Sequence, residues 1–353
     1  MASNGCTGSS PVRGTFLNMK KIAYFIVFII SLVLTSCGAS KGNFKIEGKF
    51  LHMNQGEFYV YSTDGAIQGM DTIKVEGGRF AYEIPCQEEG TLMLVFPNFS
   101  EVPIFVESGG SIDIKADASH LKELQVKGTD ANEDMTDVRM QLNKVSPPEE
   151  RQVAETFIKE NPGSIVSTYL VRKYFIQGYQ PDYKKALSLI NLMLKEQDKN
   201  GQLQRLKQQT ENLAASAIGN SIPTFSAKDI NGQPVSNNTL TNSPFAVIYV
   251  WSNWNYESQQ MQRDLKNLQR KSAGKLALLG ICAEGNQQDC KNTMKRDSIK
   301  APTICDGMML ECNTIKKLGL TAVPDNLVLQ NGRIIARSLN PRELQDKLNS
   351  LLK

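Results

Sequence analysis

The chain has 353 residues, of which 41% are hydrophobic and 22% are charged, and its formal net charge is +4. This is the composition of ordinary globular material. So small a charge over this length gives no argument for binding to nucleic acid, and we expect no nucleic-acid partner. The length suggests two domains, or one domain with a substantial insertion.

A short basic run, Met19-Lys20-Lys21, precedes an apolar stretch from Ile22 to Leu34. This order is that of the n-region and h-region of a signal peptide. The stretch is shorter than the roughly 20 apolar residues that span a bilayer. We therefore expect it to be removed and not to anchor the chain.

Small residues frame Cys37 where the apolar stretch ends, and Leu34-Thr35-Ser36-Cys37 resembles the lipobox of bacterial lipoproteins. The resemblance implies that Cys37 is acylated, becomes the first mature residue and holds the protein on a lipid bilayer. The alternative is an ordinary secretory peptide that happens to contain a cysteine.

The residues after Cys37, from Gly38 to Gly42, lack both the aspartate that retains lipoproteins in the inner membrane and an acidic surface-export signal. The expected location is the cell envelope, at the outer membrane facing the periplasm. Residues 1–18 are interpreted as an upstream extension from a wrongly chosen start codon, which leaves Cys6 without a role. The extension and signal peptide together take up residues 1–36.

Residues 37–130 contain short runs that alternate polar and apolar residues, separated by turn residues. Such alternation predicts antiparallel strands, and Glu76-Gly77-Gly78 is a hairpin signal between two of them. We expect these strands to form a small β-sandwich. The strands are expected near residues 44–50, 57–61, 71–75, 79–84, 91–96, 103–106, 111–114 and 124–126.

This part resembles a β-module of unknown function that precedes thioredoxin-like domains in many envelope lipoproteins. The residues that carry the resemblance are Ile46-x-Gly48, Asp71-Thr72, Gly78-x-Phe80, Phe105-Val106-Glu107 and Lys127-Gly128-Thr129 with Asn132.

Residues 131–217 have apolar residues at helical spacing, cut by Pro147-Pro148, Asn161-Pro162 and Gln180-Pro181. Proline is common in the first turn of a helix, so these positions predict helix starts. We interpret the segment as a helical connector. A spacer that orients the end domains is favoured over a binding role, since leucine stripes usually form core.

From Ile218 to Lys353 the sequence resembles the TlpA-like and redoxin branches of the thioredoxin superfamily. The opening, Gly219 to Val235, carries the resemblance, and after it come apolar strands near residues 245–251 and 276–281 with a helix between them. This alternation predicts parallel strands with helical crossovers. A hairpin with an Asn331-Gly332 turn and a helix from Pro341 close the domain.

In that family a C-x-x-C motif follows the first of these strands, at the start of the next helix. The helix N-terminus lowers the pKa of the first cysteine, and the second cysteine resolves the mixed disulfide. Here Asn255 and Ser258 take the two cysteine positions. Neither residue can exchange with a disulfide, while Asn255 is a good helix N-cap.

Pro324 matches the family's cis-proline, whose loop faces the motif and binds an extended substrate backbone. The next residue, Asp325, is expected to place a negative charge in that groove and so to oppose peptide binding of the usual kind. The candidate binding groove is Trp251, Trp254, Tyr256, Glu257, Pro324 and Asp325. Both tryptophans as packing residues are an equal alternative.

Four cysteines, Cys282, Cys290, Cys305 and Cys312, fall in the same domain. In an oxidising envelope Cys305 with Cys312, or Cys282 with Cys290, are plausible disulfides, although sequence does not choose among three connectivities. A buried core thiol at Cys282 is the favoured reading over a redox role. His52 and His120 show no partner at metal-ligand spacing, so no metal and no cofactor are expected.

The sequence therefore favours a lipid-anchored thioredoxin-like protein with a degenerate active site, which binds or scaffolds an unknown envelope protein or peptide. The alternative is a thiol-disulfide oxidoreductase or peroxidase that uses Cys282, Cys290, Cys305 or Cys312. Fold alone does not decide between them, because function resides in the site.

Overall fold

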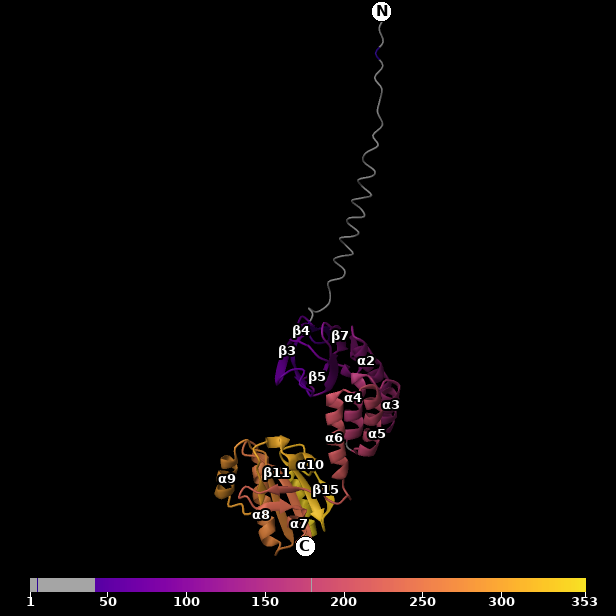
Figure 1. The fold of residues 1–353 in the computed structure, drawn as a ribbon. Helices are drawn as coiled ribbons and strands as arrows, with labels where there is room; N and C mark the ends of the chain where they lie inside the picture. Colours follow the sequence, from indigo (N-terminus) through magenta and orange to yellow (C-terminus); the bar gives the residue numbers. More distant parts are fainter. Residues whose placement is uncertain (1–4, 6–41, 179) are drawn as a thin grey trace, which may run out of the picture. The chain divides into compact units, whose positions relative to one another are not determined.

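The computed structural model describes residue 5, residues 42–178 and residues 180–353. These residues form two compact units, one up to Pro147 and one from Pro148 to Lys353 (Figure 1). The expected signal peptide and Cys37 lie outside the described residues, as does the upstream extension apart from residue 5. Among the described residues, no helix has the length and apolarity needed to cross a membrane.

The first unit is built on one sheet of eight strands in the order β6-β5-β2-β3-β4-β1-β7-β8. The strands are β1 (Asn43–Leu51), β2 (Gln55–Ser62), β3 (Met70–Glu76), β4 (Arg79–Pro85), β5 (Gly90–Val95), β6 (Glu101–Val106), β7 (Ser111–Asp117) and β8 (Gln125–Lys127). The predicted β-rich N-terminal module is thus confirmed, but its strands form one hydrogen-bonded sheet where a β-sandwich of antiparallel strands was expected, and β1 pairs with β7 in parallel. Period-two alternation is the same in both kinds of pairing, so it does not reveal such a pair.

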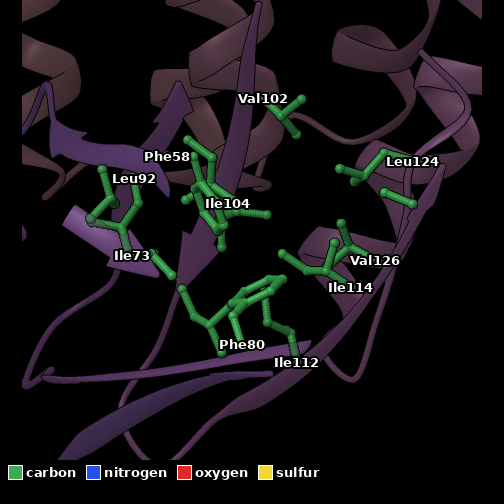
Figure 2. Close-up of a cluster of buried hydrophobic side chains, with 14 of the residues drawn as sticks. Phe58, Ile73, Phe80, Leu92, Val102, Ile104, Ile112, Ile114, Leu124 and Val126 are labelled. Atoms are coloured by element: carbon green, nitrogen blue, oxygen red, sulfur yellow. The ribbon is translucent and has the colours of Figure 1, made fainter. Parts of the chain in front are cut away.

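Apolar side chains from all eight strands meet in one buried cluster, part of which Figure 2 shows. The rings of Phe50, Phe58, Phe80 and Phe96 lie at its centre, with centroids 5.0 to 5.9 Å apart. Burial of each such ring contributes roughly 1.5–3 kcal/mol. One face of a continuous sheet therefore surrounds a single core.

A single helix, α2 (Asp130–Leu142), contacts both edge strands of this sheet. On β6, the Asn132 side chain accepts a hydrogen bond from Phe105 N at 3.0 Å and donates one to Phe105 O at 2.7 Å. On β8, the Thr136 hydroxyl lies 3.1 Å from Val126 N and 3.2 Å from Val126 O. The helix thus satisfies backbone groups that an open edge would leave to other chains.

Two glycines among the residues that carried the β-module resemblance occupy positions that admit no side chain. Gly128 has a φ of +120°, and a Cβ there would lie 2.3 Å from Ser111 O. A Cβ on Gly48 would lie 2.4 Å from the Phe80 ring. Gly128 is required by its backbone conformation and by close approach, and Gly48 by close approach alone.

The second unit begins with helices, which confirms the predicted helical connector. They are α3 (Pro147–Glu160), α4 (Ile165–Val171), the π-helical segment η2 (Arg172–Ile176), α5 (Tyr183–Glu196) and α6 (Gly201–Ala215). Ser164, Asp182 and Asn200 cap the starts of α4, α5 and α6 through side-chain hydrogen bonds. After α6, Arg337 donates to Ser216 O at 2.9 Å, so the helical part is tied to the α/β part that follows.

The α/β part has a five-stranded sheet in the order β13-β12-β11-β14-β15. Strands β11 (Phe245–Trp251), β12 (Leu276–Cys282) and β13 (Thr303–Ile304) are parallel, while β14 (Asp325–Gln330) and β15 (Arg333–Arg337) are antiparallel. The remaining elements are the paired strands β9 (Ser226–Lys228) and β10 (Pro234–Ser236), helices α7 (Asn237–Leu240), α8 (Tyr256–Lys271), α9 (Gln287–Arg296), α10 (Asn313–Lys317) and α11 (Pro341–Leu351), and the 3-10 turn η3 (Met309–Glu311).

Two core clusters cover the two faces of this sheet. Along β11, Val247, Tyr249 and Trp251 join one cluster, while the alternate residues join the other. Helices α8 and α11 contribute to the first cluster, and α10 contributes to the second. The predicted multidomain fold, a β-module, a helical connector and an α/β domain, is therefore the one observed.

Candidate functional site

The candidate site lies where β11 ends and α8 begins. Trp251 and Cys282 are paired at the ends of the parallel strands β11 and β12. The carboxyl ends of parallel strands meet at one edge of a sheet, which is the usual place for a site in such folds.

Asn255 is the N-cap of α8, and its side-chain oxygen accepts a hydrogen bond from Ser258 N at 2.7 Å. Its amide nitrogen donates to Val323 O at 3.2 Å. The Val323–Pro324 peptide bond that follows is cis. Asn255, at the first motif position, therefore links the helix start to the proline loop. Its side-chain oxygen already accepts the hydrogen bond of one first-turn amide.

Ser258, at the second motif position, is fully buried. Its hydroxyl accepts a hydrogen bond from Ser252 N at 3.1 Å and donates to the carbonyl of Asn255 at 2.8 Å. The hydroxyl thus fastens the helix start to the end of β11. Both motif positions hold polar side chains engaged in local hydrogen bonds, and neither supplies a thiol.

The turn is also held from the side by residues that no sequence pattern singled out. Asn253 N donates to the carboxylate of Glu284, just after β12, and Asn253 Oδ1 accepts from Thr293 of α9 at 2.6 Å. Gln259 Nε2 donates to Asn253 O at 2.7 Å. Because these partners are separated by up to forty positions along the chain, only the folded sheet brings them together.

Four of the six residues expected in the groove lie on the surface or partly exposed. Trp254 is 58% exposed and Tyr256 is 75% exposed, Glu257 is exposed, and Pro324 is half-buried. Arg263 lies over the Tyr256 ring, 5.8 Å from its centroid. An aromatic pair beside the helix start is therefore accessible to a partner.

The expectation for the other two groove residues is wrong. Trp251 is fully buried in the core, because it is the last residue of β11 and points under the sheet. Asp325 is only 3% exposed. Its carboxylate accepts hydrogen bonds from Thr321 N, Asn326 N and Ser338 Oγ at 2.8 to 2.9 Å, so it adds no charge to a groove.

Three of the four cysteines form a buried group, here called the thiol cluster: Cys282, Cys290 and Cys305, whose sulfurs lie within 4.8 Å of one another. All are free thiols. Cys312 is also a free thiol, but it packs in the core cluster on the other face of the sheet. The pairing of Cys305 with Cys312 is therefore wrong, since the sheet separates them.

The thiols differ in acidity because they bond to one another. Hydrogen bonds from Cys282 and Cys290 lower the pKa of Cys305, and backbone amides of Gly307 and Glu284 add to this effect. Hydrogen bonding to Cys290 and Cys305, followed by burial, raises the pKa of Cys282. Cys305 is thus the thiol of the cluster that ionises first.

The three cysteines come from the end of β12, the first turn of α9 and the residue after β13. Sequence placed Cys282 at this edge, but α9 and β13 could not be positioned without the strand order. The cluster is the one group of potential metal-ligating side chains of this size in the part of the chain that the structure describes. A site of this kind was not anticipated.

The two histidines, which have no partner at metal-ligand spacing in the sequence, lie near one aspartate in the fold. His52 Nδ1 lies 3.0 Å from one oxygen of Asp117, and His120 Nδ1 lies 3.7 Å from the other. The hydrogen bond with His52 lowers the pKa of Asp117 to about 2. Both histidines are exposed, and they lie in the β-module, away from the turn in the sequence.

Parallel strands continued by an antiparallel hairpin, a helix that begins directly after β11 and a cis-proline that meets its first residue define a thioredoxin-like domain. Residues 218–338 match the AhpC/TSA family. Residues 44–135 match a domain of unknown function, DUF4369. The chain thus carries a thioredoxin-superfamily domain of the redoxin type behind an additional N-terminal domain. No curated protein matches the sequence significantly.

Several solved structures are similar to parts of this chain. A thiol-disulfide oxidoreductase from Bacteroides fragilis is 25% identical over 37% of this chain and 98% of its own, with a TM-score of 0.34. A thioredoxin-like protein from Parabacteroides distasonis is 21% identical over 38% of this chain and 96% of its own, with a TM-score of 0.32. A thioredoxin-like protein from Bacteroides caccae is 13% identical over 62% of this chain and 83% of its own, with a TM-score of 0.44.

Proposed function

We propose that this protein is a lipid-anchored thioredoxin-like protein of the cell envelope that binds another envelope protein or peptide and does not perform thiol–disulfide exchange at its helix start. The observation that carries the proposal is the turn itself. Asn255 and Ser258 fill the motif positions with structural hydrogen bonds, while Trp254 and Tyr256 beside them are exposed.

Exchange at this position requires a thiolate, which a helix start stabilises through its free amides. Here the Ser258 amide already donates to the side chain of Asn255. No cysteine lies between Cys86 and Cys282 in the sequence, so shifting the alignment by a few residues does not restore the motif. The chemistry of the motif is absent while its architecture is retained.

A binding role suits the exposed residues of the turn. Tryptophan and tyrosine combine large apolar area with a polar group and are common anchors at protein interfaces. Their exposure leaves that area free to be buried by a partner. The carbonyl of Val323 already accepts a hydrogen bond from Asn255. We therefore expect a partner to contact the aromatic rings and not to pair with the backbone of the proline loop.

The anchor part of the proposal rests on the signal-peptide pattern and on Cys37. Strand β1 begins at Asn43. Five residues then separate it from Cys37, and extended chain spans at most about 3.6 Å per residue. A lipid on Cys37 would hold the β-module within about 20 Å of the bilayer surface.

The binding role is tested by photo-crosslinking in intact envelopes, with a photoreactive residue at position 256. We expect a discrete crosslinked species that decreases when Trp254 is replaced by alanine. Position 99 is the matched control, because Phe99 is also an exposed aromatic residue but lies in the β-module. Equal crosslinking at positions 99 and 256, or no effect of Trp254→Ala, would contradict a specific partner at the turn.

A thiol-disulfide oxidoreductase or peroxidase is the second candidate function. It is favoured by the proximity of Cys282, Cys290 and Cys305, which a two-electron thiol reaction needs. Against it stand the burial of all three residues and the lack of access that reactive cysteines require. Activity lost on Cys282→Ser would favour this candidate over the binding role.

A further inference from the structure

The thiol cluster has a fourth sulfur at its side. Cys290 Sγ lies 3.9 Å from the thioether sulfur of Met294. The two residues are one helical turn apart on α9, so they share a face of the helix. Met294 packs against the same core cluster as the three cysteines. A fourth sulfur therefore lies beside one of the three thiols.

The spacing of the thiols fits coordination to one metal ion. An ion about 2.3 Å from three sulfurs in a trigonal arrangement holds those sulfurs about 4 Å apart. The thiols already lie within 4.8 Å of one another. Rotation of side chains is sufficient to close the difference, and no movement of a strand or helix is required.

The donor set selects the kind of metal. Hard ions such as Mg²⁺ and Ca²⁺ need oxygen ligands, and structural Zn²⁺ sites use four thiolate or imidazole ligands. Here the group of ligands in the described residues contains no imidazole and no carboxylate. Three thiols with a thioether form a soft set, which favours Cu(I) among the biological metals.

We propose that Cys282, Cys290 and Cys305 bind one Cu(I) ion, with the thioether of Met294 as a weak further ligand. The proposal does not depend on the binding role of the turn. The ion enters as Cu(I) and stays Cu(I). Its binding displaces the thiol protons to solvent, so no electron is transferred and no oxidant is needed.

The surroundings suit such a site. Gln287 Nε2 donates to the carbonyl of Cys305 at 2.8 Å, which fixes the backbone of one ligand. The chain after Cys305 leads to Met308, which is 58% exposed, and Met309, which is 46% exposed. Thioethers at the surface are soft ligands of the same kind.

The test uses the full chain in detergent, reduced and kept free of oxygen, and titrated with Cu(I) against a chromophoric Cu(I) chelator. We expect one ion per chain held in competition with the chelator and an X-ray absorption spectrum with sulfur as the only neighbour. Cys290→Ser should weaken binding at least about 100-fold, and Met294→Leu about 10-fold. Cys312→Ser and Cys86→Ser are the matched controls and should bind like the wild type.

Met294→Leu preserves volume, so it keeps the test valid if a cysteine variant fails to fold. Four results would overturn the proposal. The first is binding that is unchanged in both Cys290→Ser and Met294→Leu. The second is nitrogen or oxygen in the metal's coordination shell. The third is preferential binding of Zn²⁺ over Cu(I) in the same competition. The fourth is a disulfide within the thiol cluster that persists under the reducing conditions.

Discussion

Asn255 retains the helix start that a reactive cysteine occupies in redox-active thioredoxin-like domains. Its oxygen caps α8 and its amide nitrogen contacts the carbonyl before the cis-proline. At the position of that reactive cysteine, the Asn255 side chain thus makes two structural contacts. The residue is therefore expected to contribute to stability.

Replacement of Asn255 by alanine should lower the free energy of unfolding of the C-terminal domain by about 1 kcal/mol, because the cap is lost. Asn255→Asp keeps an oxygen at the cap and should cost less. Both tryptophans of the chain lie in this domain, so denaturant unfolding followed by tryptophan fluorescence reports on it alone. Equal midpoints for Asn255→Ala and the wild type would show that the cap is not a stabilising contact.

At the scale of the residue, sequence identified the missing cysteines and the cap, because both follow from residue type at a fixed place after a strand. The sequence did not predict the direction in which each side chain points. Trp251 is the last strand residue and points into the core, while Asp325 meets backbone donors that only the folded loop supplies. Clusters such as Cys282 with Cys290 and Cys305 depend on strand order, which local patterns do not contain.

At the scale of the element, α2 fixes both edges of the β-module sheet through Asn132 and Thr136. Sequence placed this helix in the connector, since helical spacing says nothing of which sheet a helix covers. Strand positions were predicted closely because alternation and turn residues are local signals. The parallel pairing of β1 with β7 is a long-range contact, which those local signals do not predict.

Asn132→Ala should destabilise the β-module by about 2 kcal/mol, because it removes the two hydrogen bonds that the Asn132 side chain makes to the buried N–H and C=O of Phe105. Hydrogen exchange of a peptide covering residues 101–106 measures the effect, which should appear as faster exchange. Asn143→Ala is the control: Asn143 is exposed at the end of the same helix, and its side chain donates to the Lys122 carbonyl and not to a strand. Slow exchange retained in Asn132→Ala would show that the edge is held by other contacts.

The contact between α8 and the end of α9 depends on pH. Arg296 and Arg263 bond to Asp297 at 3.0 and 3.3 Å, and the hydrogen bond from Arg296 is the main cause of the lowered pKa of this carboxyl. Because the folded-state pKa lies below the unfolded value of about 3.9, the contact contributes fully above that value and is lost as pH falls through the folded pKa.

We therefore expect Asp297→Asn to lower the stability of the C-terminal domain at pH 7 by about 1 kcal/mol. The difference from the wild type should shrink as pH falls below about 4. Unfolding midpoints by tryptophan fluorescence between pH 7 and pH 3 measure it. Asp346→Asn, at an exposed position on α11, serves as the control. A difference that stays constant over this range would contradict an electrostatic origin.

At the scale of the whole molecule, a β-module, a helical connector and a thioredoxin-like domain follow one another behind a predicted lipid anchor. This order of domains suits a membrane-anchored oxidoreductase. The turn at Asn255 and Ser258 supports a different role, in which the lipid anchor presents a binding surface. The thiol cluster lies beneath the same sheet edge and supplies chemistry that the turn lacks.

The most direct test is a disulfide-reduction assay of the wild type beside the double variant Asn255→Cys with Ser258→Cys. Both proteins are produced as the full chain, purified, and assayed with an excess of reductant and with insulin as the substrate. We expect no turnover by the wild type and clear turnover by the double variant, because the helix start is intact and lacks only its thiols. Turnover by the wild type that is abolished by Cys282→Ser would contradict a non-catalytic binding role.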